Sequence, residues 1–223
     1  MTKALVLLSG GIDSAVCLRK ALQQHSEVEA IHFDYGQQTE HIERRNAQKQ
    51  CREKDVELEI VDYRDVFSNF AEGTVRDKEY NSSNTVEDEH SVGYVPQRNL
   101  HLLTSAAAKA EHHSETGEEI FLYIGVQSGD AGDYPDCRPE FMELAEKTIN
   151  QATEQHEFNI ETPLISRSKE EVLELGQELG VTWELTFSCY NDENENPCGE
   201  CPACIEREEA FQKIDFDDPI RQE

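Results

Sequence analysis

The stretch Ala4–Ser14 reads ALVLLSGGIDS and is the most informative part of this 223-residue chain. Its continuous apolar run, Ala4 to Leu8, is typical of a strand that is buried on both faces of a parallel sheet. Two glycines follow, and a helical spacing of apolar residues continues from Ala15. The segment therefore predicts a strand, a tight turn and a helix in direct succession.

A glycine turn of this kind is suited to binding phosphate. Gly10 and Gly11 allow close approach of the backbone, and the hydroxyls of Ser9 and Ser14 can donate hydrogen bonds to phosphate oxygens. The helix N-terminus adds backbone N–H groups and a partial positive charge. The Gly-x-x-x-x-Gly-Lys spacing of GTPases and kinases is absent here, so the turn suits pyrophosphate held as a leaving group. The alternative is an ordinary strand-to-helix turn.

We expect the nucleotide to contact the segment Leu8, Ser9, Gly10, Gly11, Ile12, Asp13, Ser14, Ala15, Val16, Cys17 and Leu18. Asp13 is unusual in a site for anions. Its expected roles are capping the helix and ligating Mg²⁺ or water near the phosphates. Ser9, Asp13 and Ser14 are therefore candidate catalytic residues.

The rest of the chain alternates strand-like and helix-like segments. This order predicts an α/β fold with a doubly wound, mostly parallel sheet. Ser168 and Glu171 form a capping box that predicts a helix start. The polar segment 68–92 is expected to be a long loop or lid. We expect an α/β nucleotide-binding domain over 1–185 and a C-terminal metal-binding segment over 186–223. The predicted strands are 3–8, 28–33, 56–61, 120–126 and 160–164, and the predicted helices are 13–24, 39–54, 100–112, 139–155 and 169–179.

The charge is strongly acidic, with 47 Asp and Glu residues against 20 Lys and Arg and a net charge of −27. The acidic residues are spread along the chain, which favours an acidic shell suited to a high-salt cytoplasm over a patch for one cationic partner. Such a surface repels nucleic acid phosphates at low salt, so direct nucleic acid binding is not expected. No segment reads as a signal peptide or a membrane span, which indicates a cytoplasmic protein.

Four of the seven cysteines lie within sixteen residues, with the spacing C-x8-C-x2-C-x2-C. In a cytoplasmic chain this clustering indicates a metal site rather than disulfides. Four thiolates complete the tetrahedral shell of a structural Zn²⁺, to which we assign no chemistry. An iron–sulfur cluster is the alternative, because ferredoxins also use cysteines at this spacing. The expected ligands are Cys189, Cys198, Cys201 and Cys204.

Three other places hold candidate substrate contacts. The segment 125–138 follows a predicted strand, so it lies at the sheet edge where open α/β folds bind ligands. Arg98 lies just before one predicted helix and Lys169 lies in the first turn of another. A cation at a helix start opposes the helix dipole, and a bound anion would compensate it. Solvated surface residues are the alternative at every one of these positions. The candidates for substrate binding are Arg98, Asn99, Asp130, Tyr134, Asp136 and Arg138.

Taken together, these motifs resemble the 7-cyano-7-deazaguanine synthase family of PP-loop ATP pyrophosphatases. The resemblance extends over nearly the whole chain, and the YPDCRPEF segment next to the terminal cysteines is more specific than SGGIDS alone. Gln127 and Asp133 depart from the residues common in that family. The matching segments are LLSGGIDS (7–14), FDYGQ (33–37), VPQRN (95–99), GDYPDCRPEF (132–141), ETPLI (161–165), ELTFSCY (184–190), CGECPAC (198–204) and REEAF (207–211).

The resemblance implies a PP-loop fold of the adenine nucleotide alpha hydrolase type, a zinc knuckle on the four clustered cysteines, and a homodimer. It also implies an enzyme that uses ATP, with Mg²⁺, to convert 7-carboxy-7-deazaguanine and ammonia to the nitrile used in queuosine or archaeosine modification of tRNA. Arg98 and Lys169 are expected to stabilise charge, and Asp130 and Asp136 to orient the deazaguanine N–H groups. The alternatives are a tRNA thiolase with an iron–sulfur cluster and a non-enzymatic zinc module that binds a nucleotide.

Overall fold

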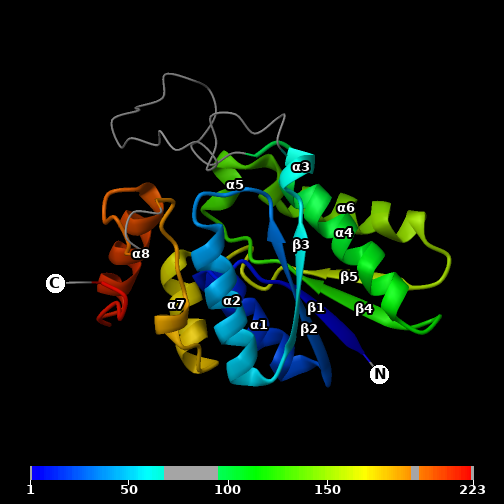
Figure 1. Cartoon of the computed structure of the whole chain (residues 1–223), viewed down its shortest axis with the longest axis horizontal. Coiled ribbons are helices and arrows are strands. Elements are labelled where there is room, and N and C mark those ends of the chain that lie inside the picture. Colours follow the sequence, from blue (N-terminus) through cyan, green and yellow to red (C-terminus); the bar gives the residue numbers. More distant parts are fainter. Residues whose placement is uncertain (1, 68–94, 192–195, 222–223) are drawn as a thin grey trace.

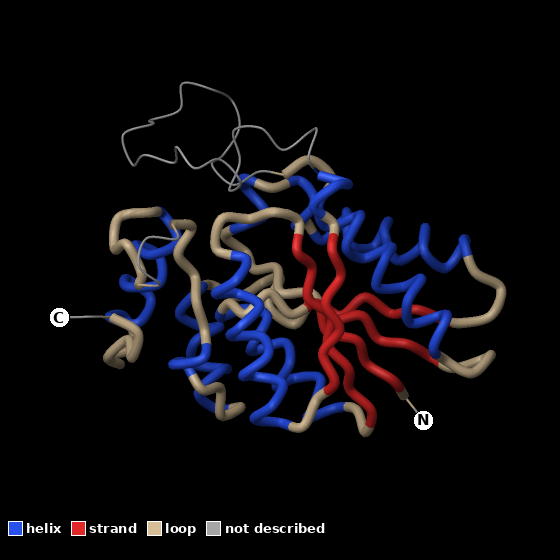
Figure 2. The backbone as a smooth tube through the Cα atoms, in the orientation of Figure 1, coloured by secondary structure: helices blue, strands red, loops and turns tan. Residues whose placement is uncertain are grey.

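The computed structural model describes residues 2–67, 95–191 and 196–221. At its centre is a parallel sheet of five strands in the order β3-β2-β1-β4-β5, with helices on both faces (Figure 1 and Figure 2). The order reverses beside β1, so the predicted doubly wound sheet is confirmed. The strands are β1 (Lys3–Leu7), β2 (Glu27–Asp34), β3 (Glu57–Asp62), β4 (Glu119–Tyr123) and β5 (Glu157–Glu161).

The helices fall into two groups that cover the two faces of the sheet (Figure 1). One face is covered by α1, α2 and α7, with α8 packed against α7, and the other face is covered by α4 and α6. The helices are α1 (Ile12–Gln24), α2 (Glu40–Lys54), α3 (Arg64–Phe67), α4 (Arg98–His113), α5 (Asp130–Asp133), α6 (Pro139–Ala152), α7 (Lys169–Glu178) and α8 (Pro202–Lys213), with 3₁₀ turns at Pro135–Cys137 and Trp183–Leu185.

The first strand supplies side chains to both layers of the core. Ala4, Val6 and Leu8 pack against the α1 layer, whereas Leu5 and Leu7 pack against the α4 layer. This division follows from the alternation of side chains along a strand. It explains why the segment is apolar at every position, since a polar residue on either face would lose its solvation.

The capping box before α7 is confirmed. The Ser168 side chain accepts a hydrogen bond from the Glu171 amide at 3.4 Å, and a Glu171 carboxylate oxygen accepts one from the Ser168 amide at 2.8 Å. Gly180 follows the helix with a φ of +68°, which suits glycine. The box fixes where α7 begins, and therefore where Lys169 enters the site.

Several elements differ from the prediction. The fourth strand, predicted over 120–126, is β4 (Glu119–Tyr123). The fifth strand is β5 (Glu157–Glu161), earlier than the predicted 160–164. Helix α8 was not predicted, because its first turn was interpreted only as cysteine ligands, although Pro202 is well placed at a helix start. Ala210 and Phe211 of α8 are buried in the main core. The predicted loop or lid at 68–92 lies outside the described residues. Across the part of the chain that is described, no helix combines the length and the apolar character needed to cross a membrane.

Candidate active site

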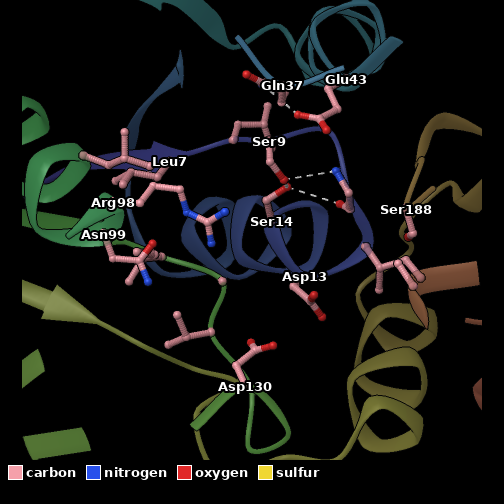
Figure 3. Close-up of a pocket in the computed structure, with 18 of the residues that line it drawn as sticks. Leu7, Ser9, Asp13, Ser14, Gln37, Glu43, Arg98, Asn99, Asp130 and Ser188 are labelled. Carbon is pink, nitrogen blue, oxygen red and sulfur yellow. Dashed lines mark hydrogen bonds between the residues drawn. The ribbon is translucent and has the colours of Figure 1, made fainter. Parts of the chain in front are cut away.

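A cavity of about 280 Å³ opens at the carboxyl ends of the strands, around the end of β1. The strand order reverses between β1 and β4, and open α/β sheets bind ligands at such a point. Its walls come from segments far apart in the sequence, including the turn after β1, the ends of β2 and β4, and the starts of α4, α7 and α8 (Figure 3). Both polar and apolar groups line it, as expected of a site for a small molecule.

The glycine turn after β1 forms one wall of this cavity. The Ser9 and Ser14 hydroxyls lie 3.0 Å apart, and the Gly11 amide donates to Ser9 Oγ at 3.3 Å (Figure 3). Gly11 is the N-cap of α1 and offers no side chain, so the first-turn amides remain for a ligand. Asp13 does not cap this helix. The turn therefore presents hydroxyls and a helix N-terminus to an anion.

Gly10 holds the turn in place. Its φ is +89°, and a Cβ there would lie 2.3 Å from the Glu43 carbonyl oxygen. Its own carbonyl accepts hydrogen bonds from the Gln50 side chain at 3.3 Å and from the Phe187 amide at 3.1 Å. Gly125, after β4, approaches α1 closely too, since a Cβ would lie 2.9 Å from the Asp13 carbonyl carbon. Only glycine fits at either position.

Lys169 reaches the turn from the start of α7. Its ammonium lies 2.8 and 3.0 Å from the two Asp13 carboxylate oxygens and 3.5 Å from a Glu206 oxygen. The Lys169 side chain is only 11% exposed. Burial by itself would lower the pKa of Lys169, but the Asp13 and Glu206 carboxylates outweigh it and raise that pKa. Lys169 is therefore charged at neutral pH.

Asp130 faces the same group of charges from α5 (Figure 3). Burial, together with the negative charges of Asp13 and Glu206, raises the pKa of Asp130 to about 6. Its Oδ2 accepts a hydrogen bond from the Gln127 amide at 3.0 Å, and the Gln127 side chain donates to Glu206 at 3.0 Å. Three carboxylates thus surround one ammonium. Oxygen ligands with excess negative charge fit Mg²⁺, which takes one or two carboxylates together with phosphate oxygens.

Arg98 lies at the start of α4, and its guanidinium points toward Ser9 and Ser14 (Figure 3). It donates to the Tyr35 hydroxyl over 3.5 Å and lies 5.8 Å from the centroid of that ring. Within the described residues, no carboxylate lies at ion-pair distance from Arg98. A half-buried cation that faces the glycine turn and has no carboxylate partner among the described residues is suited to an anionic ligand.

The predicted substrate residues separate into two groups. Arg98, Asn99, Asp130 and Tyr134 line the cavity, as do Lys169 and the turn residues Leu8, Ser9, Gly11, Ile12, Asp13 and Ser14. Asp136 and Arg138 do not line it; Arg138 is exposed at the start of α6. The Asp136 carboxylate instead accepts the Asn99 amide at 3.0 Å, which supports the start of α4. Five of the predicted nucleotide contacts do not line the cavity, namely Gly10, Ala15, Val16, Cys17 and Leu18. The last four are buried in the core behind the turn.

Cys137 lines the cavity as a protonated thiol. Burial raises the pKa of Cys137 to about 12, and its sulfur accepts a hydrogen bond from the Asn99 side chain at 3.3 Å. A thiol of such a high pKa is a poor nucleophile at neutral pH. Its position therefore indicates packing rather than chemistry.

Several lining residues were not among the sequence-based candidates. Tyr35 and Gln37 follow β2 directly, so the rule that places ligands at strand ends would have identified them. Ser188, Tyr190 and Glu206 come from the C-terminal segment. Ser188 and Tyr190 lie in the matching segment ELTFSCY (184–190), but no role was predicted for them. No sequence pattern indicated Glu206, whose position depends on how α8 packs beside α7.

The four clustered cysteines form a compact group beside the cavity. All four sulfurs lie within 4.8 Å of one another, and the Cys189–Cys201 and Cys198–Cys204 sulfur pairs are each 4.0 Å apart. Backbone amides donate hydrogen bonds to the Cys189 and Cys198 sulfurs. A tetrahedral ion with metal–sulfur bonds of about 2.3 Å requires sulfurs about 3.8 Å apart. The group therefore fits one metal ion.

The solved structures support the fold. NMN synthetase from Francisella tularensis has a TM-score of 0.54 at 15% identity, covering 96% of this chain and 78% of that one. A predicted subunit of tRNA methyltransferase from Methanocaldococcus jannaschii has a TM-score of 0.51 at 12% identity, covering 100% and 93%. At such low identity these similarities show the arrangement of elements only.

Curated relatives are much closer in sequence. The chain is 38% identical to a protein of Leptospira interrogans, covering 95% of this chain and 87% of that one. It is 37% identical to a protein of Methanoculleus marisnigri, covering 100% of both, and 39% identical to one of Thermoplasma volcanium, covering 98% and 90%. Each of the three is named 7-cyano-7-deazaguanine synthase. The sequence profile described as "Queuosine biosynthesis protein QueC" matches residues 3–215, and the chain therefore belongs to this family.

Proposed function

We propose that this protein is an ATP-dependent carbon–nitrogen ligase that converts 7-carboxy-7-deazaguanine and ammonia to 7-cyano-7-deazaguanine. The names of the relatives support this reaction. The observation that carries it is the arrangement of Arg98 opposite the Ser9–Ser14 turn in one cavity. This arrangement can hold a substrate carboxylate next to the phosphates of ATP.

The reaction needs two activations of oxygen. A substrate carboxylate oxygen attacks the α-phosphorus of ATP, which gives an acyl adenylate and releases pyrophosphate. Ammonia then forms the new C–N bond, AMP leaves with the electron pair of the C–O bond, and one proton passes to water. The amide oxygen attacks a second ATP in the same way. Loss of AMP and of the remaining N–H protons gives the nitrile, so both substrate oxygens leave in AMP.

The residues of the cavity can be assigned roles in this scheme. The amides and hydroxyls of the turn bind the departing pyrophosphate. Arg98 binds the substrate carboxylate, and Lys169 offsets the charge that develops on the phosphates. Tyr134 supplies a flat wall for the deazaguanine ring, and Asp130 accepts hydrogen bonds from its N–H groups.

Two metal ions belong to the proposal. Asp13 would hold Mg²⁺ beside the triphosphate, where the ion would neutralise phosphate charge. Zn²⁺ would occupy the four-cysteine group as a structural ion, because a closed site of four thiolates leaves no open position for substrate. A [4Fe–4S] cluster binds each cysteine through a different iron, and a [2Fe–2S] cluster binds two cysteines at each of two irons. Both therefore need some of the four sulfurs farther apart than the 4.8 Å within which all four lie here. The observed spacing therefore favours zinc and disfavours the thiolase alternative.

We further propose a cytoplasmic homodimer that works at high salt. Its product would enter queuosine or archaeosine modification of tRNA, without the enzyme itself binding nucleic acid. In this scheme residues 1–185 bind the nucleotide and residues 186–223 bind zinc. Light scattering after gel filtration in molar KCl measures the oligomeric state.

One assay tests the reaction. The purified protein is incubated with 7-carboxy-7-deazaguanine, ATP, Mg²⁺ and nitrogen-15 ammonium in concentrated KCl, and the products are analysed by mass spectrometry. We expect AMP and a nitrile heavier by one mass unit. Omitting the carboxylate is the control and should abolish AMP release. Absence of both products would refute the ligase and favour a nucleotide-binding zinc module, whereas a brown protein with an iron absorbance would favour a thiolase.

A further inference from the structure

Tyr35 and Arg98 form a pair of hydrogen-bond donors inside the cavity. Arg98 Nη1 lies 3.5 Å from the Tyr35 oxygen. A guanidinium has no acceptor, so Arg98 must donate to the phenolic oxygen. The phenolic proton remains for a third group, and nothing in the described ranges accepts it. Both residues line the cavity, so the natural third group is an oxygen of the ligand.

Tyr35 retains this proton at neutral pH. Burial raises the pKa of Tyr35, and the nearby positive charge of Arg98 only partly offsets that effect. A phenol of raised pKa remains protonated and is a hydrogen-bond donor throughout the physiological range. The pair thus combines one charged and one neutral donor.

The position of Tyr35 is fixed before any ligand arrives. Its amide donates to the Gln37 side chain at 3.0 Å, and the next amide, Gly36, donates to Asp34 at 3.0 Å. The Tyr35 ring packs edge-on against Phe67, with centroids 6.1 Å apart. Donors held in place in this way do not need to reorganise when charge develops, which is what makes them effective in catalysis.

The pair also lies where the acyl group must be. Arg98 points toward the Ser9–Ser14 turn, which receives the phosphates (Figure 3). Tyr134 and Tyr190 line the same cavity and offer aromatic faces to a flat ring. A heteroaromatic carboxylate between them would direct its carboxyl group to Arg98 and Tyr35.

We propose that Arg98 and Tyr35 together form the oxyanion hole of the amidation step. This inference rests on the proposed ligase function. When ammonia attacks the acyl adenylate, the N–C bond forms and the C=O electron pair moves to oxygen. Two donors then stabilise that oxyanion. Its collapse expels AMP with the C–O electron pair, and the surplus ammonium proton passes to water.

The two donors differ in when they act. Arg98 binds the carboxylate ground state and the oxyanion, because both are anions. Tyr35 acts mainly on the oxyanion, since a single neutral hydrogen bond adds little to a carboxylate already held by a guanidinium. Removing one donor from an oxyanion hole lowers the rate by about 10²–10³-fold. Tyr35→Phe should therefore slow amidation and leave adenylation intact.

Two measurements separate these steps. Carboxylate-dependent exchange of labelled pyrophosphate into ATP, without ammonium, reports adenylation. Quenched-flow mass spectrometry of the amide after ammonium is added reports amidation. Tyr63→Phe is the matched control, because it removes the same hydroxyl group from a tyrosine outside the cavity lining. The Tyr63 hydroxyl forms a hydrogen bond with the Ser105 hydroxyl. Thermal melting verifies that each variant folds.

We expect Tyr35→Phe to exchange pyrophosphate within about threefold of the unaltered protein and to form amide about 10²-fold more slowly. Arg98→Met should lose both activities and bind the carboxylate more weakly in calorimetry without ATP. Tyr63→Phe should match the unaltered protein in both assays. The proposal is overturned if Tyr35→Phe lowers exchange and amidation equally, or lowers neither. If the unaltered protein shows no exchange and no nitrile, the ligase function itself is refuted.

Discussion

The ammonium of Lys169 lies 2.8 Å from a carboxylate oxygen of Asp13, although 156 positions separate the two residues. The contact joins the first turn of α7 to the first turn of α1. A lysine in a first turn opposes the helix dipole, whereas the aspartate favours it, so each residue compensates the other. The ion pair places a cation next to the glycine turn.

Replacing Lys169 by Met should lower the rate of carboxylate-dependent pyrophosphate release by about 10²-fold, because a preorganised charge is lost from the site. Steady-state kinetics with a coupled pyrophosphate assay measures this change. Lys147→Met is the control, since the Lys147 side chain is 71% exposed and distant from the cavity lining. An unchanged rate in Lys169→Met would remove Lys169 from the mechanism.

Gly10→Ala should prevent nucleotide binding and destabilise the fold by more than about 2 kcal/mol. The new Cβ would lie 2.3 Å from the Glu43 carbonyl oxygen, in addition to the strain of a positive φ, which costs about 1–2 kcal/mol by itself. Gly117→Ala is the matched control, because its φ of +90° is the same and nothing lies within 4 Å. Urea unfolding and ATP calorimetry measure both effects. Equal losses of stability and of ATP affinity in the two variants would show that the close approach of Gly10 to α2 is unimportant.

The free energy of unfolding should decrease as the pH rises from about 4 to about 6, because Asp130 loses its proton in this range. Its pKa is raised from 3.8 to about 6, chiefly by burial, so the folded state binds the proton more tightly than the unfolded state. Stability contributed by this group is complete below its ordinary pKa, falls through the window, and is constant above it. In Asp130→Asn this component should vanish. Urea unfolding at pH 4.5 and pH 7, at fixed salt, measures how much the free energy of unfolding of each protein changes with pH. An equal change in the two proteins would contradict the buried carboxyl.

Cys201→Ser should reduce bound zinc to well below one ion per chain. Loss of a structural metal is among the few changes that cost more than about 4 kcal/mol, so the melting temperature should fall by about 10 °C or more. Elemental analysis and calorimetry measure the two effects. Cys51→Ser is the control, because Cys51 is buried in the main core and is not part of the cysteine group. If both variants retain full zinc, the four cysteines are not the site.

Concentrated KCl should stabilise the protein. With 47 acidic residues against 20 basic ones, repulsion among surface carboxylates opposes folding, and salt screens it. The melting temperature should rise by about 10 °C between 0.1 M and 2 M KCl, an effect equivalent to about 3 kcal/mol for a chain of this size. A melting temperature independent of KCl would argue against the halophilic interpretation.

Much of the fold was predictable because its signals are local. The apolar run of β1, the glycines after it and the capping box at Ser168 are each contained in a few consecutive residues. Helix α8 was missed for the opposite reason. Its start at Pro202 overlaps the cysteine motif, and only contact with the main core, through Phe211, shows why it is helical.

The same distinction applies to the site. The sequence located the glycine turn and the four clustered cysteines, because glycine conformation and cysteine spacing are properties of short segments. Tertiary structure decided which distant residues meet there: Glu206 beside Lys169, and Tyr35 beside Arg98. Such contacts depend on strand order and helix packing, which bring together side chains that share no local pattern. Asp136 was predicted to bind substrate, but tertiary structure keeps it out of the cavity lining. Its carboxylate instead accepts a hydrogen bond at the start of α4.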